Sequence, residues 1–258
     1  MAGIVVSRRY RWAGYLLGFS LSGFFDGILL HQILQWHHLL SAVGTGDIRF
    51  QVAADGYFHA LMYAIAAAGL WLLWRSRNDP GRKTGRSLAA AMLVGFGVWH
   101  VLDAVLSHWI LGIHRIRMDS PHPLFWDLLW FGLFGLVPLI LGWLLREGPD
   151  EDGTAGRRSS FVVRSLAALL VAGAGAVALR PPQDGAFTTV LFAPGTGQER
   201  VLRAVASVDG EMLWTDPTGE LVVIRSARAG AGFALLRQGA VLVSGLGLPP
   251  GCFSFLKV

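Results

Sequence analysis

The sequence predicts an all-α membrane protein, in which a four-helix transmembrane bundle made from a duplicated two-helix unit is followed by a fifth transmembrane helix and a small α+β ferredoxin-like C-terminal domain. Three observations support this prediction. Hydrophobic residues form 53% of the 258 residues and charged residues only 15%, which is a more apolar composition than water-soluble domains have. Several apolar stretches reach the length that a bilayer requires, and two of them share a pattern of ionisable residues.

Five apolar stretches are each about long enough to cross ~30 Å of hydrocarbon as a helix. They cover residues 12–38, 57–74, 88–114, 124–145 and 161–179. Arginines precede the first stretch and occupy the connection between the second and the third, so the positive-inside rule places both segments in the cytoplasm. The N-terminus is then cytoplasmic, and because the number of spans is odd, the C-terminal region is extracytoplasmic.

Charge and cysteine content narrow the range of functions. The net charge of +5 comes mainly from arginine, which in a membrane protein indicates cytoplasmic loops, so we expect a lipid bilayer as partner and no nucleic acid. The first apolar stretch carries Asp26 and His31 and is too long for the core of a cleavable signal peptide. Cys252 is the single cysteine, so any metal must be bound by His, Asp, Glu or Met.

Three domains are predicted: a His-rich four-helix domain over 1–147, a cytoplasmic linker with the fifth helix over 148–181, and an extracytoplasmic α+β domain over 182–258. In the last domain, alternating apolar residues and turn residues predict the ferredoxin-like order β-α-β-β-α-β. The expected elements are strands at 187–192, 211–215, 219–225 and 240–244 and helices at 197–206 and 229–238. This domain has no histidine, and we expect it to be an accessory or partner-docking domain.

An internal repeat relates the first apolar stretch to the third. At an offset of 77 residues both carry the pattern D-x-x-L-x-H-x-I-L-x-x-H, which aligns Gly18, Asp26, His31 and His37 with Gly95, Asp103, His108 and His114. The second and fourth stretches agree less well, and His59 stands near the place of Asp127. Each repeated unit has two spans, so the copies share one orientation and predict a pseudo-twofold axis along the membrane normal. Equivalent histidines, such as His31 and His108, are expected to face one another across that axis.

The predicted depths place these residues in layers. Most of the candidate ligands lie at the outer ends of the helices, whereas His31 and His108 sit about 9 Å deeper and the two repeated aspartates lie near mid-membrane. On a straight helix Asp26 and His37 are nearly in line, but His31 lies on a second stripe about 120–140° away. A straight helix cannot aim all of these groups at one ion, so we expect two layers, two sites, or one site built from one stripe of each helix.

Ionisable side chains inside a bilayer are costly, so each is a candidate functional residue. Imidazole and carboxylate without thiolate suit several transition metals, and we expect copper or iron. The predicted metal ligands are His31, His37, His59, His108, His114 and Asp127. The residues predicted to orient these ligands or to carry protons are Asp26, His100 and Asp103. A purely structural role is at least as well supported for His38, His122 and Asp55.

The leading interpretation is a membrane metalloprotein that uses the His/Asp cluster near the extracytoplasmic side for redox chemistry or for handling copper or iron, with respiratory or metal-handling membrane proteins as partners. Whether it is an enzyme, such as a metal-dependent membrane oxidoreductase, is left open. Alternatively, His31 and His108 are the axial ligands of haem b in an electron-transfer protein. A third interpretation is a non-enzymatic proton-coupled transporter or assembly factor, in which the histidines titrate.

Three stretches resemble a family of uncharacterised bacterial polytopic membrane proteins, domain-of-unknown-function family 2243. They are GFFDGILLHQILQWHH (23–38), DGYFHALMY (55–63) and VWHVLDAVLSHWILGIHRIRMD (98–119). The resemblance covers about residues 10–147. It implies a four-helix membrane unit in the bacterial inner (cytoplasmic) membrane and implies no reaction, and the fifth span and the C-terminal domain fall outside it.

Overall fold

The structure is a computed structural model that describes residues 7–34, 36–43, 48–79, 84–147, 154–178, 187–226, 228, 230–244 and 247–248. Cys252 and residues 148–153 of the predicted linker lie outside these residues. The chain forms two compact units. We call Met1–Asp26 with Leu61–Gly175 the bundle unit, and Gly27–Ala60 with Ala176–Val258 the sheet unit.

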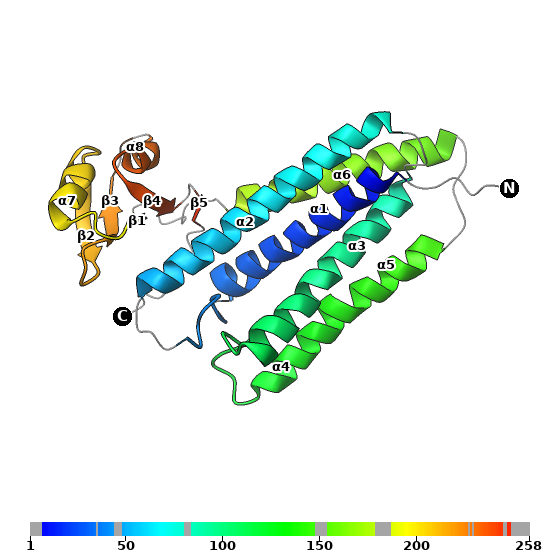
Figure 1. Ribbon diagram of the computed structural model, residues 1–258, viewed down its shortest axis with the longest axis horizontal. Coiled ribbons are helices and arrows are strands. Elements are labelled where there is room, and N and C mark those ends of the chain that lie inside the picture. Colours follow the sequence, from blue (N-terminus) through cyan, green and yellow to red (C-terminus); the bar gives the residue numbers. More distant parts are fainter. Residues whose placement is uncertain are drawn as a thin grey trace. The chain divides into compact units, whose positions relative to one another are not determined.

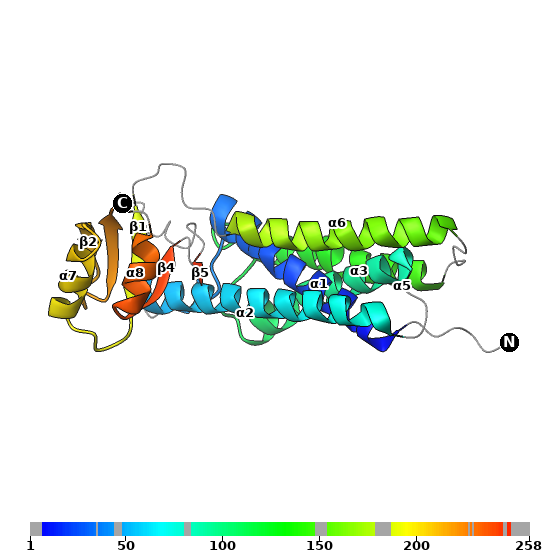
Figure 2. The ribbon, with the colours of Figure 1, turned by 90° about the horizontal axis from the view of Figure 1, so that it is seen from above.

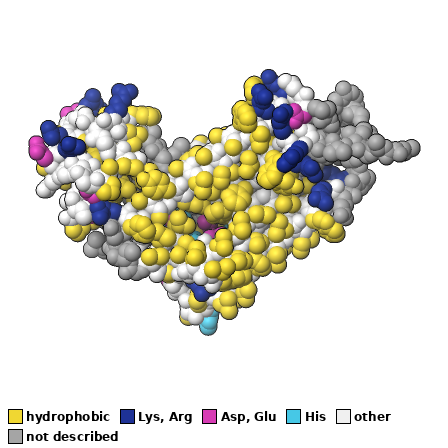
Figure 3. Space-filling model, viewed as in Figure 1, with side chains coloured by type: hydrophobic (Ala, Val, Ile, Leu, Met, Phe, Trp, Pro, Cys, Tyr) yellow, Lys and Arg dark blue, Asp and Glu magenta, His cyan; other side chains and the backbone are white. Residues whose placement is uncertain are grey.

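Among the described residues, five helices are long and apolar enough to cross a membrane, in agreement with the five predicted spans. They cover Arg8–His31, Ile48–Asn78, Gly85–Ile110, Pro123–Arg146 and Ser160–Val177. Figure 3 shows hydrophobic side chains over most of the visible face of these helices, where they suit contact with lipid tails. Exposed tryptophans, among them Trp12, Trp74 and Trp143, lie at the arginine-rich end of the bundle unit, as is typical of a membrane interface.

The bundle unit is built from six helical segments. They are α1 (Arg8–Asp26), the second half of α2 (Ile48–Arg75), α3 (Gly85–Leu102), α4 (Pro123–Trp130), α5 (Val137–Glu147) and α6 (Thr154–Ala178). The short η2 (Ser76–Asn78) extends α2, and η4 (Phe131–Leu136) joins α4 to α5. Figure 1 shows α1, α3 and α5 side by side, with α3 packed against both of the others.

Hydrogen bonds between helices attach α6, the fifth span, to the rest of the bundle unit. The backbone N–H of Gly85 at the start of α3 donates to Oγ of Ser160 at 2.9 Å. Further along α6, the hydroxyl of Tyr63 in α2 donates to the carbonyl oxygen of Gly175 at 2.7 Å. The fifth span is therefore an integral part of this unit.

Glycines allow α1 and α3 to approach closely. A Cβ at Gly18 would lie 1.9 Å from the carbonyl oxygen of Met92. A Cβ at Gly95 would lie 2.1 Å from the carbonyl oxygen of Tyr15. The two glycines are 77 residues apart, and so are the two residues that supply the carbonyl groups. The contact is therefore reciprocal: each helix presents the same glycine to the same position of the other.

The first and third membrane helices change from α to π geometry before they end. α1 continues into η1 (Gly27–Ile33), and α3 continues into η3 (Asp103–Ile110). In each case the residue after the π-helix donates its N–H to a carbonyl oxygen five residues earlier, at 2.8 Å. The sequence predicts helices as far as residues 38 and 114, and this expectation is wrong because the π-turns lead into non-helical chain.

The sheet unit contains a five-stranded sheet with the order β2-β3-β1-β4-β5. Its strands are β1 (Thr188–Phe192), β2 (Glu211–Thr215), β3 (Leu221–Arg225), β4 (Ala240–Ser244) and β5 (Gly247–Leu248). The first four strands pair antiparallel, and β5 is parallel to β4. Figure 2 shows the two helices beside this sheet, α7 (Gln198–Ala206) and α8 (Ala231–Arg237). The six predicted elements are confirmed within two residues, and β5 is an addition.

The two faces of the sheet have different partners within the sheet unit. Val190 and Ile224 on one face pack into a core with side chains of α7 and α8. Leu191 and Leu221 on the other face pack against Val52 in the first turns of α2. Successive side chains of a strand point to opposite sides of the sheet, so neighbouring apolar residues such as Val190 and Leu191 contribute to different faces.

Arg49, in the first turn of α2, adds charged contacts to the same face. Its guanidinium lies 3.4 Å from the carboxylate of Asp216 and also pairs with Glu220. Asp216 accepts hydrogen bonds from the hydroxyl of Thr218 and from three backbone N–H groups of the β2–β3 turn. Burial alone would raise the pKa of Asp216, but these hydrogen bonds hold it below its ordinary value. The carboxylate is thus ionised at neutral pH and attracts Arg49.

We expect Gly95→Ala to destabilise the bundle unit, because its methyl group would meet the backbone of α1 at 2.1 Å and force two helices apart. Overpacking of this kind costs about 1–3 kcal/mol of unfolding free energy. Gly132→Ala is the matched control, since nothing lies within 4 Å of a Cβ at that position. Thermal unfolding of the purified variants in detergent measures the difference, and equal stabilities would contradict the close approach of α1 and α3.

Candidate metal centre

Four ionisable side chains meet at the end of η3 in the bundle unit: Asp103, His108, His114 and Asp127, all buried. We call them the His108 group. The first two belong to η3, the third lies on the non-helical chain after it, and Asp127 belongs to α4. The break in the helix lets the chain turn back, and the rings of His108 and His114 meet edge-on with their centroids 4.8 Å apart.

Both imidazoles of the His108 group share the carboxylate of Asp103. One of its oxygens lies 3.2 Å from Nε2 of His108, and the other lies 3.4 Å from Nε2 of His114. Ligand atoms bonded at about 2.0–2.1 Å to one metal ion are separated by about 2.8–3.4 Å at octahedral or tetrahedral angles. The spacing around Asp103 is therefore that of a site with two histidines and one carboxylate, and these three residues could hold a metal ion.

His108 has a carboxylate at each ring nitrogen. Its Nδ1 lies 3.1 Å from Asp127, and its Nε2 lies 3.2 Å from Asp103. A neutral imidazole carries one N–H, so it can donate to only one of these carboxylates and turns a lone pair toward the other. The second contact needs a further cation, which is either a proton on the ring or a metal ion beside it.

Asp127 is held in place by groups outside the cluster of rings. Its Oδ2 accepts a hydrogen bond from Arg115 at 2.8 Å, and its Oδ1 accepts one from the backbone N–H of Ile116 at 3.0 Å. A fixed carboxylate at the far nitrogen of a histidine selects the tautomer and orients the ring toward a metal. The position of Asp127 suits this orienting role.

A similar set of buried side chains lies in the sheet unit, and we call it the His31 group. It consists of His31 in η1, His37 and His38 on the chain after η1, and Asp55 and His59 in α2. The rings of His31 and His37 have centroids 4.8 Å apart. Nδ1 of His38 donates to Asp55 at 2.7 Å, and Nδ1 of His31 lies 3.8 Å from the same carboxylate. His31, His38 and Asp55 could hold a metal ion.

The contacts of the two groups correspond. Asp55 accepts hydrogen bonds from a backbone N–H and from the preceding side chain, His38. Asp127 accepts the same two bonds, with Arg115 in place of His38. These two donors are 77 residues apart, which is the offset of the sequence repeat. By these hydrogen bonds it is Asp55 that resembles Asp127, whereas the sequence places His59 near that position.

A change of offset hides this correspondence in the sequence. Asp55 and Asp127 are 72 residues apart instead of 77, because the loops before them differ in length. Further along, Gly69 and Gly142 make equivalent contacts with the first and the third membrane helix at an offset of 73. The additional residue is accommodated in η4, since a π-turn contains one residue more than an α-turn.

The π geometry also explains why the ionisable side chains converge. Residues five apart lie about 140° apart around an α-helix, but a π-turn closes its hydrogen bond from residue i to i+5 and brings them onto one face. Asp103 and His108 are five residues apart and both lie in η3. The predicted separation into two stripes is thus wrong over these segments, because it assumes a straight α-helix.

His59 offers a lone pair to the His31 group. Its Nδ1 donates to the backbone carbonyl oxygen of Asp55 at 2.8 Å, so the neutral ring keeps its lone pair on Nε2. That Nε2 is buried and accepts no hydrogen bond from the described residues. The ring packs on Gly27, where a Cβ would lie 2.4 Å from Nε2. Gly27 therefore makes room for this imidazole.

His100 has an aromatic environment within the bundle unit. The indole N–H of Trp130 donates to its Nδ1 at 3.2 Å. The rings of Phe25, Phe96 and Phe134 lie around it at centroid distances of 5.0–6.2 Å. His100 belongs to none of the metal-compatible sets found among the described residues, and its role in proton transfer stays a prediction.

Each predicted ligand falls into one of the two groups, and Asp103, predicted to orient ligands or carry protons, belongs to the His108 group. Asp26 ends α1 with a buried side chain, directly before η1. The facing of His31 and His108 stays a prediction. Sequence analysis favours a structural role for His38 and Asp55 at least as much as a functional one, although His38 aligns with Arg115 at the offset of the repeat and Asp55 stands one helical turn before His59.

The loop between η3 and α4 carries polar side chains that lie outside the His108 group. His122 is exposed at the start of α4, as expected for a residue without a role in the cluster. Arg117 donates a hydrogen bond to Asp119 at 2.8 Å, and this bond holds the pKa of the exposed Asp119 carboxyl below its ordinary value. His122 and Asp119 therefore serve as control positions for substitutions in the His108 group.

A family model described as "Predicted membrane protein (DUF2243)" matches residues 13–148, which is just over half of the chain. Comparisons with curated proteins and with solved structures found no match. The matched range includes both groups of histidines and aspartates, whereas the fifth candidate span and the C-terminal sheet lie beyond it. The chain therefore belongs to the DUF2243 family of predicted membrane proteins.

Proposed function

We propose that the protein is an integral membrane metalloprotein that binds copper or iron through buried His and Asp side chains near the extracytoplasmic surface. The observation that carries this proposal is the convergence of Asp103, His108 and His114, in which one carboxylate lies within 3.4 Å of two imidazole nitrogens. Ionisable groups within apolar helices are costly without a partner. A metal ion would bind all three groups. It would also supply the positive charge that His108 needs in order to lie between two carboxylates.

The donor set supports iron as the first choice and copper as the second. Two imidazoles and one carboxylate are the ligands of non-haem Fe(II) sites that keep coordination positions open, and copper also accepts imidazole ligands. In this assignment Asp103 is a ligand, and Asp127 orients His108 through Nδ1. The sequence alone predicts the opposite assignment, with Asp127 as a ligand and Asp103 as an orienting or proton-carrying residue.

The proposal includes a duplicated two-helix unit with one metal position in each copy. Its support is the reciprocal glycine contact of α1 and α3, the equal ring separations of 4.8 Å in the two groups, and the matching hydrogen bonds of Asp55 and Asp127. Within the sheet unit, the ligand atoms of His31, His38 and Asp55 are close enough together to hold an ion. We accordingly assign a second ion to the His31 group.

For the C-terminal domain we propose a ferredoxin-like fold in an accessory or partner-docking role. The antiparallel order β2-β3-β1-β4 and the packing of both helices on one face support that fold. The domain has no histidine, so the proposal assigns metal binding to the membrane helices. Respiratory or metal-handling membrane proteins are the expected partners.

Haem b has weaker support than a single metal ion. Axial ligation needs an open face at one ring nitrogen, and each ring nitrogen of His108 faces a carboxylate. The ring of His31 is in contact with the rings of His37, His38 and His59. A proton-coupled transporter or assembly factor without metal would instead carry a proton on His108.

The proposed orientation follows from the distribution of arginine. The arginine-rich end of the bundle unit, where α1 and α3 begin, is assigned to the cytoplasm of a bacterial inner membrane. The His108 group follows the other end of α3. It is therefore assigned to the extracytoplasmic side, where redox chemistry or metal handling would take place.

Metal content tests the proposal directly. We expect the purified protein loaded with Fe(II) or copper to retain the metal, and His114→Gln to lower the metal-to-protein ratio by roughly half because one of two groups loses a ligand. His122→Gln is the matched control and should leave the ratio unchanged. Elemental analysis and optical spectra are the measurements. A Soret band, or no metal in the unaltered protein, would contradict the proposal.

The role of Asp127 gives a second test. Asp127→Asn should weaken metal affinity about 10–100-fold, because the amide no longer holds the His108 ring as an ionised carboxylate does. The amount of metal bound at saturation should stay the same, since no ligand is removed. Asp119→Asn, a neighbouring exposed carboxylate, is the control. Competition with a chelator measures the affinities, and equal affinities of the two variants would exclude the orienting role.

A further inference from the structure

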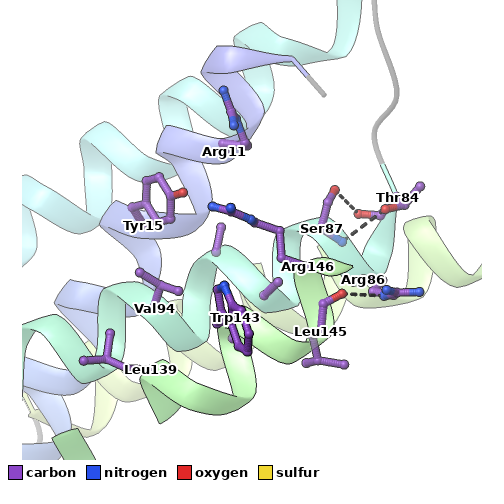
Figure 4. Close-up of a pocket in the computed structure, with 13 residues that line it drawn as sticks. Arg11, Tyr15, Thr84, Arg86, Ser87, Val94, Leu139, Trp143, Leu145 and Arg146 are labelled. Carbon is purple, nitrogen blue, oxygen red and sulfur yellow. Dashed lines mark hydrogen bonds between the residues drawn. The ribbon is translucent and has the colours of Figure 1, made fainter. Parts of the chain in front are cut away.

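A cavity of about 590 Å³ lies at the arginine-rich end of the bundle unit. Its walls come from the first turns of α1, the first half of α3 and most of the length of α5, and Figure 4 shows the side chains around it. The His108 group lies beyond the opposite end of α3. The cavity is therefore a separate candidate site, and the proposed metal chemistry does not use it.

Three guanidinium groups line this cavity, one from each helix, and among the described residues none of those lining it is acidic. They belong to Arg11 in α1, Arg86 in α3 and Arg146 in α5. Nε of Arg86 donates to the carbonyl oxygen of Leu145 at 2.6 Å, which fixes its side chain at the end of α5. Figure 4 shows Arg146 reaching across the opening toward Arg11 and Tyr15.

This arrangement of charge favours an anionic ligand. The guanidinium groups of Arg11, Arg86 and Arg146 surround one space, and an anion there would reduce the repulsion between these like charges. Thr84 caps the start of α3 through the backbone N–H of Ser87, so the positive end of the helix dipole adds to the attraction.

The deeper part of the cavity is apolar. Val94 and Leu139 line it, and Leu139 lies seven residues, or about 10 Å, deeper along α5 than Arg146. Trp143 lies between these levels and is 53% exposed, as is typical of tryptophan at the boundary of a membrane. The cavity thus changes from charged to apolar in the direction in which a lipid changes from headgroup to acyl chain.

We propose that this cavity binds the phosphate headgroup of an anionic phospholipid on the cytoplasmic side. Guanidinium groups match the geometry of phosphate oxygens and can bind them in pairs. Basic pockets between membrane helices on the cytoplasmic side are suited to anionic lipid headgroups. A free phosphate has the same charge chemistry but makes no use of Val94 and Leu139, so the apolar depth favours the lipid.

Native mass spectrometry of the full chain in detergent tests the proposal, with phosphatidylglycerol and phosphatidylcholine added at equal concentrations. We expect phosphatidylglycerol to remain bound in preference. Arg146→Gln and Arg11→Gln should each weaken its binding about fivefold. Arg77→Gln is the matched control, because it removes the same charge at the same end of the unit, from a guanidinium that stacks on Trp74 at 4.4 Å outside the cavity.

Three outcomes would overturn the proposal. Equal retention of the two lipids would show that charge does not select the ligand. An equal loss of binding in Arg77→Gln and Arg146→Gln would indicate a diffuse surface charge instead of a site. Saturable binding of inorganic pyrophosphate that displaces phosphatidylglycerol and is lost in Arg146→Gln would assign the cavity to a soluble phosphate. Metal content should not change in these variants, so the result is independent of the proposed metal function.

Discussion

Contacts between carboxylate and imidazole groups inside apolar helices are the constraint on which the membrane domain depends. A single charged side chain at the bilayer centre costs about 2.5–3.5 kcal/mol on insertion scales, so each such group needs a partner of opposite or complementary character. The chain provides the partners by interrupting its own helices. η1 and η3 change the helical phase, and the chain after each returns a second histidine to the first. Backbone hydrogen bonds over five and six residues compensate for the interruption.

Close packing in the middle of α1 and α3 holds these two helices together. The reciprocal contacts of Gly18 and Gly95 leave no space for a larger side chain at either position. The two halves are nevertheless chemically unequal, because His38 donates to Asp55 where Arg115 donates to Asp127. Arginine is always charged. Asp127 therefore has a permanent cation beside it, whereas Asp55 has an imidazole in the same place.

Sequence reasoning predicts those features that depend on local pattern. The five spans follow from apolar runs, and the strands and helices of the C-terminal domain follow from alternation and turn residues such as Asp216 and Gly219. The π-turns leave no comparable signal, because one additional residue in a helical turn does not change the apolar pattern. Asp55 is not among the predicted metal ligands because the repeat does not pair it with Asp127. Its counterpart Asp127 stands at an offset of 72, and an alignment at 77 does not pair them.

Helix α2 contacts the sheet and also carries two residues of the His31 group. Arg49 and Val52 in its first turns bind to the sheet, and Asp55 and His59 follow within the next three turns. A helix is stiff over such a short length, so a force on the sheet is also a force on the carboxylate that Asp55 offers to His31 and His38. A displacement of the C-terminal domain would therefore also displace Asp55 and His59. A protein that bound this domain would change the position of the carboxylate beside the imidazoles.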